Sequence, residues 1–182
     1  MQTVGGNHEL GYYENWVDYN ARYPTPYKGS LSTNPCYYAT TAGPVHIIAL
    51  CTYSNFFQGS LQYNWLQNHL ANAIDRVSTP WVIVMLHAPL YCALGGSYAE
   101  AELMRRELEP LMYAAGVDMI VNGHIHSYER SLPVYNFNAS DPCGAVNIGI
   151  GDAGELCIIF LLIVGLLDHT LYREPRRSIS SF

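Results

Sequence analysis

Three histidines stand at points of the sequence where they could bind metal together. His124 and His126 lie one residue apart in the stretch GHIHSYER, and His87 ends the run VMLH. Imidazole nitrogens bind first-row transition metals well when several of them converge on one point. The i, i+2 spacing on an irregular segment also lets two imidazoles turn toward two neighbouring ions. The pattern therefore predicts a site for one or two metal ions.

The stretch GGNHE near the start of the chain offers a second kind of ligand. Asn7 carries a neutral amide oxygen, and His8 beside it can donate a proton or a hydrogen bond to an oxyanion. Gly5 and Gly6 let this segment fold tightly against a ligand. Taken alone, the stretch is typical of a turn with a polar tip, and its significance depends on the histidines elsewhere.

The histidines follow segments that have the character of buried strands. Short apolar runs predict strands at 45–51, 81–86 and 117–121, with further short strands after residue 130. Helical spacing predicts helices at 61–76, capped by Ser60, and at 99–115, ended by Gly116. This alternation predicts an α/β domain whose ligands bind at the carboxyl ends of the strands, where His87 and His124 lie.

Charge and length exclude several classes of function. The 182 residues suit one domain, and a net charge of −6 with nine scattered Lys and Arg residues forms no basic stripe. We therefore expect no nucleic-acid partner and no binding to an anionic membrane. An anionic ligand must instead be attracted by a local positive charge, such as a metal ion.

The cysteines and one tripeptide are relevant to the cellular compartment in which the protein is located. Five cysteines form no C-x-x-C pair, which argues against a structural zinc knot and leaves their pairing open. Asn138-Ala139-Ser140 is an N-glycosylation sequon, usable only in the secretory pathway. The first residues have neither the basic nor the apolar region of a signal peptide.

The final part of the chain differs from the rest. We expect residues 1–155 to form the catalytic domain and residues 156–182 to be an apolar and then polar tail. Its run of eleven apolar residues, 157–167, is short of the roughly 20 that span a bilayer. A buried strand or helix is therefore favoured over a membrane anchor.

Taken together, the blocks GNHE, VMLH and GHIHSYER resemble, in order and spacing, the last three metal-binding blocks of the purple acid phosphatases. These enzymes are a branch of the calcineurin-like metallophosphoesterases, and the later stretch DPCGAVNIGIGDAGE is also similar to them. The resemblance implies part of a four-layer αββα sandwich, N-terminally truncated, and an acid phosphatase that hydrolyses phosphate monoesters. It also implies an extracellular or vacuolar glycoprotein and is compatible with a homodimer.

The resemblance assigns a role to each candidate residue. Asn7, His87 and His124 would bind a divalent zinc, iron or manganese ion, while His126 would bind iron(III). His8 would lie near the leaving-group oxygen as a candidate acid. Tyr128, Glu129 and Arg130 would orient the histidine loop through hydrogen bonds. The plant-type enzymes often carry a further histidine shortly after HAPLY, where this chain reads CALGGSYAE.

Two further blocks of the family, G-D-x-G and G-D-x-x-Y, are expected before GNHE, but only six residues precede Asn7. Their two aspartates and one tyrosine are the anionic ligands of the binuclear centre. The remaining ligands are neutral, so we expect this chain to hold at most one weakly bound divalent ion. The alternatives are a phosphodiesterase or nucleotidase with two divalent metals, and a non-catalytic binding protein that retains the fold.

Overall fold

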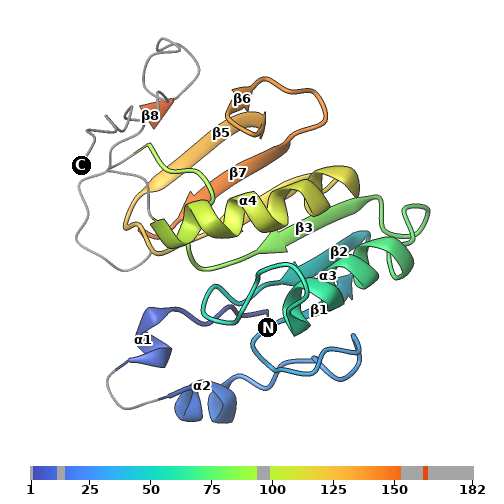
Figure 1. The fold of residues 1–182 in the computed structure, drawn as a ribbon, viewed down its shortest axis with the longest axis vertical. Helices are drawn as coiled ribbons and strands as arrows, with labels where there is room; N and C mark the ends of the chain where they lie inside the picture. Colours follow the sequence, from blue (N-terminus) through green and yellow to red (C-terminus); the bar gives the residue numbers. More distant parts are fainter. Residues whose placement is uncertain (1, 12–14, 94–98, 153–161, 164–182) are drawn as a thin grey trace, which may run out of the picture.

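A single mixed sheet organises the chain in the computed structural model, which describes residues 2–11, 15–93, 99–152 and 162–163 (Figure 1). Its order is β1-β2-β3-β4-β7-β5-β6, with β8 beside β5. The four central strands, β2, β3, β4 and β7, run parallel, whereas β1 and β5 pair antiparallel with their neighbours β2 and β7. The strands are β1 (Tyr38–Ala42), β2 (Val45–Ala49), β3 (Trp81–Met85), β4 (Met119–Asn122), β5 (Tyr128–Tyr135), β6 (Asn138–Ala139), β7 (Ala145–Ile150) and β8 (Leu162–Ile163).

Four helices accompany the sheet in the described part of the chain: α1 (Asn7–Leu10), α2 (Val17–Arg22), α3 (Leu61–Asn72) and α4 (Ala99–Ala114). The two longer ones, α3 and α4, lie against the same face of the sheet, while α1 and α2 lie beyond the β1 side (Figure 1). Ser60 caps α3 by accepting a hydrogen bond from the Tyr63 amide, and Gly116 follows α4 with a φ of +65°.

The predicted α/β domain is confirmed, and most boundaries fall within a few residues of those expected. Helix α3 ends four residues earlier than predicted, at Asn72, and its buried face is formed by Gln62, Trp65, Leu66 and His69. Strand β1 and helix α2 were not predicted. Strand β5 begins at Tyr128, inside the GHIHSYER stretch, so this block is partly strand and not only loop.

The two faces of the sheet differ in burial. On the face toward α3 and α4, Ile48, Val84 and Ile120 are almost fully buried and join the core with Leu66 and Met104. The alternate residues of the same strands lie on the second face, where their neighbours across the strands are also apolar and only half-buried. They are Ile47, Ile83, Met119 and Val146 in one row and Met85, Val121 and Ile148 in the next.

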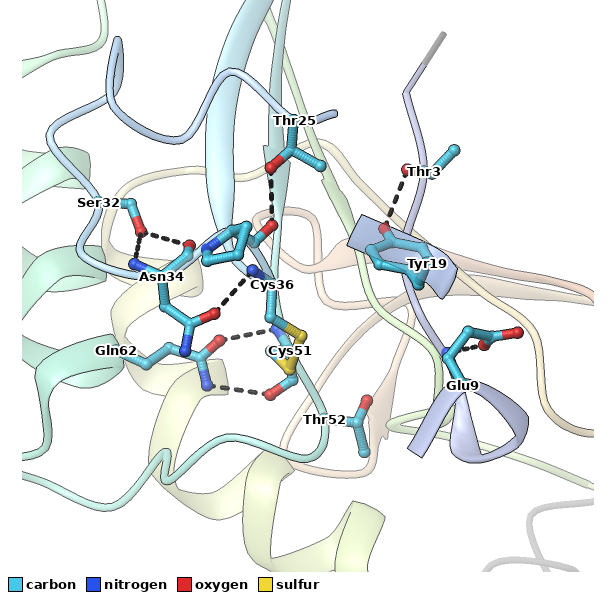
Figure 2. The surroundings of a disulfide bond; sticks show 12 residues. Thr3, Glu9, Tyr19, Thr25, Ser32, Asn34, Cys36, Cys51, Thr52 and Gln62 are labelled. Atoms are coloured by element: carbon cyan, nitrogen blue, oxygen red, sulfur yellow. Dashed lines mark hydrogen bonds between the residues drawn. A yellow bond between two sulfur atoms is a disulfide. The ribbon is translucent and has the colours of Figure 1, made fainter. Parts of the chain in front are cut away.

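A disulfide joins Cys36, just before β1, to Cys51, just after β2 (Figure 2). Both cysteines are buried, and one side chain makes hydrogen bonds to both the amide and the carbonyl of Cys51. Gln62 accepts from the Cys51 amide at 2.7 Å and donates to the Cys51 carbonyl at 3.0 Å. The pairing left open by the sequence is therefore settled for two of the five cysteines.

A pair of buried histidines packs between β2 and α3. The Nε2 atoms of His46 and His69 lie 2.9 Å apart, and His69 also stacks on Trp65. Burial and, less strongly, the neighbouring His46 lower the pKa of His69 to about 4. Burial and then Arg76 also lower the pKa of His46. Both rings are therefore neutral at pH 7.

We expect His69→Gln to weaken the acid sensitivity of folding. The unfolded chain takes up the His69 proton near pH 6.5 and the folded chain only near pH 4, so acid favours unfolding between these values. Glutamine retains a polar partner for His46 but does not titrate, and the variant should lose about 2 kcal/mol less stability than the parent over this range. Urea unfolding at several pH values measures the difference. Asn68→Gln, at an exposed position of the same helix, should leave the pH dependence unchanged, and an equal slope for all three proteins would contradict the expectation.

The predicted tail lies outside the described residues except for Leu162 and Ile163, which form β8. Among the residues that are described, no helix combines the length and the apolar character needed to cross a membrane.

Candidate metal centre

The ends of strands β3 and β4 bring two histidines side by side. The strands run parallel, and the Leu86 amide donates to the Val121 carbonyl at 3.0 Å. One step further, the Gly123 amide donates to the His87 carbonyl, also at 3.0 Å. These backbone bonds fix the loop that carries His87 against the loop that carries His124, as expected for ligands at the carboxyl end of a parallel sheet.

Three donor atoms meet at this edge. His87 Nε2 lies 2.9 Å from Asn7 Oδ1 and 2.9 Å from His124 Nδ1. Ligand atoms bound at about 2.1 Å to one ion are about 3 Å apart in octahedral coordination and about 3.4 Å apart in tetrahedral coordination. A neutral His87 has at most one proton on Nε2, so it cannot donate to both neighbours with good geometry. A cation would satisfy all three lone pairs together.

Asn7 reaches the histidines because a short helix starts at the right place. The Gly6 amide donates to Glu9 Oε2 at 2.6 Å, which stabilises the first turn of α1. A β-carbon on Gly6 would lie 2.5 Å from the His87 ring, and one on Gly5 would lie 2.3 Å from Trp16. The glycine pair thus packs closely against His87 and Trp16, and the expected turn is a helical turn.

The remaining predicted residues lie around this cluster. His124 has a φ of +65°, which is strained for a residue with a side chain and is typical of functional loops. His126 lies two residues further along the same loop and is exposed. His8 is also exposed, next to Asn7, and is close enough to His87 to affect its titration.

Electrostatics keep the central histidine unprotonated. Burial, followed by His124, lowers the pKa of His87 to about 4, with a smaller contribution from His8, while Glu9 opposes the shift. A neutral imidazole is the form that binds a metal ion. His87 is therefore ready to act as a ligand over most of the physiological pH range.

The donor set fits one divalent ion better than two ions. Asn7, His87 and His124 are neutral, and no group of three or more His, Cys, Asp or Glu side chains converges anywhere in the described part of the chain. An iron(III) ion beside a divalent ion carries about five positive charges, which neutral ligands do not offset. The described residues therefore bring three candidate ligand atoms together and do not form a complete binuclear centre.

Residues 2–128 match the sequence model of the calcineurin-like phosphoesterases. The chain belongs to this family. It is also similar to Purple acid phosphatase 22 from Arabidopsis thaliana, with 44% identity over 82% of this chain and 35% of that protein. Purple acid phosphatase 1 from Ipomoea batatas is 42% identical over 84% of this chain and 35% of that protein. This phosphoesterase chain thus spans about a third of the length of these relatives.

A solved structure supports the same relationship. A purple acid phosphatase from yellow lupin seeds superimposes with a TM-score of 0.70 and 25% identity, over 83% of this chain and 30% of that one. The described sheet and helices therefore have the metallophosphoesterase fold over most of this chain, and the family is one whose purple acid phosphatase members use a binuclear metal centre.

Two contacts of this phosphoesterase site were not predicted. The ring of Tyr53, in the loop after β2, lies 6.1 Å from that of His87. Glu129 accepts from the Ala93 amide at 3.0 Å and from Cys92 Sγ at 3.5 Å, so it ties the start of β5 to the loop that follows His87. A spacing pattern cannot reveal either contact, because both join segments distant in sequence.

We expect Gly6→Ala to weaken divalent-metal binding by more than tenfold. The new methyl group would overlap the His87 ring, so either the ring or the Asn7 segment must move away. Titration of the metal-depleted chain with Zn²⁺ measures the effect. Gly123→Ala is the matched control, because a β-carbon there meets nothing within 4 Å in the described structure.

The described structure places open space where a β-carbon of Gly123 would lie, so the absence of a side chain there does not serve a close contact. If Gly123→Ala weakened binding as much as Gly6→Ala, the steric explanation for Gly6 would be wrong.

Proposed function

We propose that this chain takes part in the hydrolysis of phosphate monoesters, as an acid-phosphatase-type enzyme. The observation that carries the proposal is the convergence of Asn7, His87 and His124 at 2.9 Å spacings on the strand ends. A metal ion bound there would supply positive charge for phosphoryl oxygens and would lower the pKa of a bound water. This local charge lets a chain of net charge −6 attract an anionic substrate.

Each candidate residue has its own role in the proposed reaction. Asn7, His87 and His124 hold a divalent zinc, iron or manganese ion. His8, exposed beside Asn7, donates a proton or a hydrogen bond to the leaving-group oxygen. His126 is the ligand of an iron(III) ion in a complete binuclear centre. Glu129 steadies the loop after His87 through its bond to Ala93.

We further propose that residues 1–155 are the later part of a metallophosphoesterase catalytic domain, with 156–182 as a tail. The match covers only about a third of each of these relatives, and the second sheet face is apolar but only half-buried. A second sheet layer packed on that face would bury these side chains and complete an αββα sandwich. The same layer would bring anionic ligands to the metal edge, where the described donors are neutral.

An extracellular or vacuolar location and a glycosylated chain belong to the same proposal. The buried Cys36–Cys51 disulfide supports an oxidising compartment, where such bonds persist. A homodimer is proposed from family resemblance alone.

Metal content and turnover test the function together. The full chain is purified, loaded with Zn²⁺ or Mn²⁺ and assayed for metal stoichiometry and for hydrolysis of para-nitrophenyl phosphate. We expect one bound ion per chain, low turnover, and loss of both in His124→Ala. His69→Gln, outside the site, should retain both.

Each contrary result has a distinct meaning. Two tightly bound ions per chain would contradict the one-ion site. Turnover unchanged in His124→Ala would show that the cluster does not carry out the hydrolysis. Metal binding that depends on His124 without any turnover would leave this chain a metal-binding unit and overturn the enzymatic part of the proposal.

A further inference from the structure

The peptide group that follows His87 is held from both sides. Its carbonyl, which belongs to His87, accepts a hydrogen bond from the Gly123 amide at 3.0 Å. Its amide, which belongs to Ala88, donates to the hydroxyl oxygen of Thr52 at 3.1 Å. We propose that Thr52 is a positioning residue for His87 and helps to set the affinity of the metal site proposed above, on which this role depends.

The two hydrogen bonds come from the ends of the two strands that flank β3. Gly123 directly follows β4, and Thr52 lies three residues after β2. Thr52 and Ala88 are 36 residues apart in the sequence. Ala49 and Met85, the last pair of β2 and β3, have the same separation. Thr52 therefore lies opposite Ala88 where the regular strand pairing has ended, and a side chain supplies the acceptor there.

The orientation of this peptide group limits where the His87 side chain can point. A peptide group is planar, so hydrogen bonds at its oxygen and at its nitrogen together fix its plane. On the other side of His87, the Leu86 amide is bonded to the Val121 carbonyl at 3.0 Å. The backbone on both sides of the His87 α-carbon is thus held, and with it the direction in which the imidazole leaves the backbone.

The His87 ring depends on that direction. Its Nε2 atom lies 2.9 Å from Asn7 Oδ1 and 2.9 Å from His124 Nδ1, and a turn of the backbone would move it away from both. Groups that orient a metal ligand through a hydrogen bond typically contribute about 10- to 100-fold to metal affinity. We therefore expect loss of the Thr52 hydroxyl to weaken metal binding.

Thr52 is itself held firmly. It directly follows Cys51, which forms the disulfide with Cys36 (Figure 2). The amide and the carbonyl of Cys51 are both bonded to Gln62. Thr52 is 4% exposed and Ala88 is fully buried, so water does not replace the hydroxyl as the acceptor of the Ala88 amide.

Two other side chains hold the same loop, but further from His87. Glu109 accepts from the Tyr91 hydroxyl, and Glu129 accepts from the Ala93 amide. These contacts lie four and six residues after His87, whereas Thr52 binds the peptide group of His87 itself. Thr52 thus acts on the position of the ligand, and the two glutamates act on the rest of the loop.

Titration of the full, metal-depleted chain with Zn²⁺ tests the role of Thr52. Thr52→Val keeps the size of the side chain but removes the acceptor, and it should weaken Zn²⁺ binding by about 10- to 100-fold. Thr52→Ser keeps the hydroxyl and should restore the affinity of the parent. Thr79→Val is the matched control, because it removes a buried hydroxyl that donates to the Asp75 carbonyl before the start of β3, whereas His87 follows the end of that strand. This control should bind Zn²⁺ as the parent does.

Folding is checked by thermal unfolding of each variant in the presence of a chelator. Thr52→Ala also lacks the acceptor and adds no methyl group in its place, so it provides the same test if Thr52→Val does not fold. A folded variant without the hydroxyl that binds Zn²⁺ as tightly as the parent would overturn the positioning role and leave the metal site intact. A Thr52→Ser variant as weak as Thr52→Val would do the same. A parent chain that binds no Zn²⁺ would instead refute the metal site, and the role of Thr52 with it.

Discussion

Replacing His87 with alanine should lower the affinity of the chain for a divalent ion by more than about 100-fold. His87 is the central member of the cluster, because its Nε2 atom is 2.9 Å from both Asn7 and His124. Removal of groups that merely support a ligand costs about 10- to 100-fold in metal affinity, so loss of a ligand itself should cost more. Titration with Zn²⁺, followed by calorimetry, measures the change.

The His87→Ala control must separate metal binding from folding. His69→Gln alters the buried pair of His46 and His69, which lies between β2 and α3, and should bind Zn²⁺ as the parent does. Thermal unfolding in the presence of a chelator should show that both variants fold. If His87→Ala kept the parent affinity, the ion would bind elsewhere and the proposed ligand set would be wrong.

The sequence could predict the parts of the site that depend on strand ends. His87 and His124 each follow a short apolar run, and parallel strands necessarily bring such positions to one edge. The loop of Asn7 was harder to place, because its position depends on contacts far along the chain. Gly6 packs against His87, eighty-one residues away, and no local pattern encodes that approach.

The fold likewise has elements that the sequence could predict and elements that depend on contacts between distant segments. Helix α4 and strands β2 and β3 have strong periodic or apolar patterns and were predicted nearly to their ends. Strand β1 was missed because its sequence, YATTA, has no apolar run, and its formation depends on antiparallel pairing with β2. The disulfide was likewise unpredictable, since five cysteines allow many pairings until the turn between β1 and β2 is known.

A second large effect is expected at Arg105, which lies on α4 and is 5% exposed. Its guanidinium pairs with Glu102 at 2.8 Å and with Glu109 at 2.9 Å and lies 4.2 Å from the centre of the Phe137 ring. Glu109 also accepts from the Tyr91 hydroxyl, four residues after His87, and burial, followed by this hydrogen bond and the Glu109 charge, raises the pKa of Tyr91. The network thus joins α4, the loop after β3 and the β5–β6 hairpin.

Arg105→Met should lower the free energy of unfolding by about 3–5 kcal/mol, because it leaves the buried Glu109 carboxylate without its cation. Methionine keeps much of the packing against Phe137, so the loss reports on charge more than on volume. Urea unfolding followed by tryptophan fluorescence measures the difference. Glu102→Gln is the matched control, since Glu102 is 30% exposed and its pairing should contribute less than about 1 kcal/mol.

The double variant Arg105→Met/Glu109→Gln distinguishes a stranded charge from lost packing. Removing the carboxylate charge should restore part of the stability that Arg105→Met loses, because a neutral amide is far less costly to bury than an unpaired carboxylate. The Tyr91 hydroxyl can still donate to the amide oxygen of glutamine. The free energy of unfolding that Glu109→Gln loses by itself is the reference. If the double variant lost that full amount in addition to the loss of Arg105→Met, the two side chains would not be energetically coupled, despite their 2.9 Å contact.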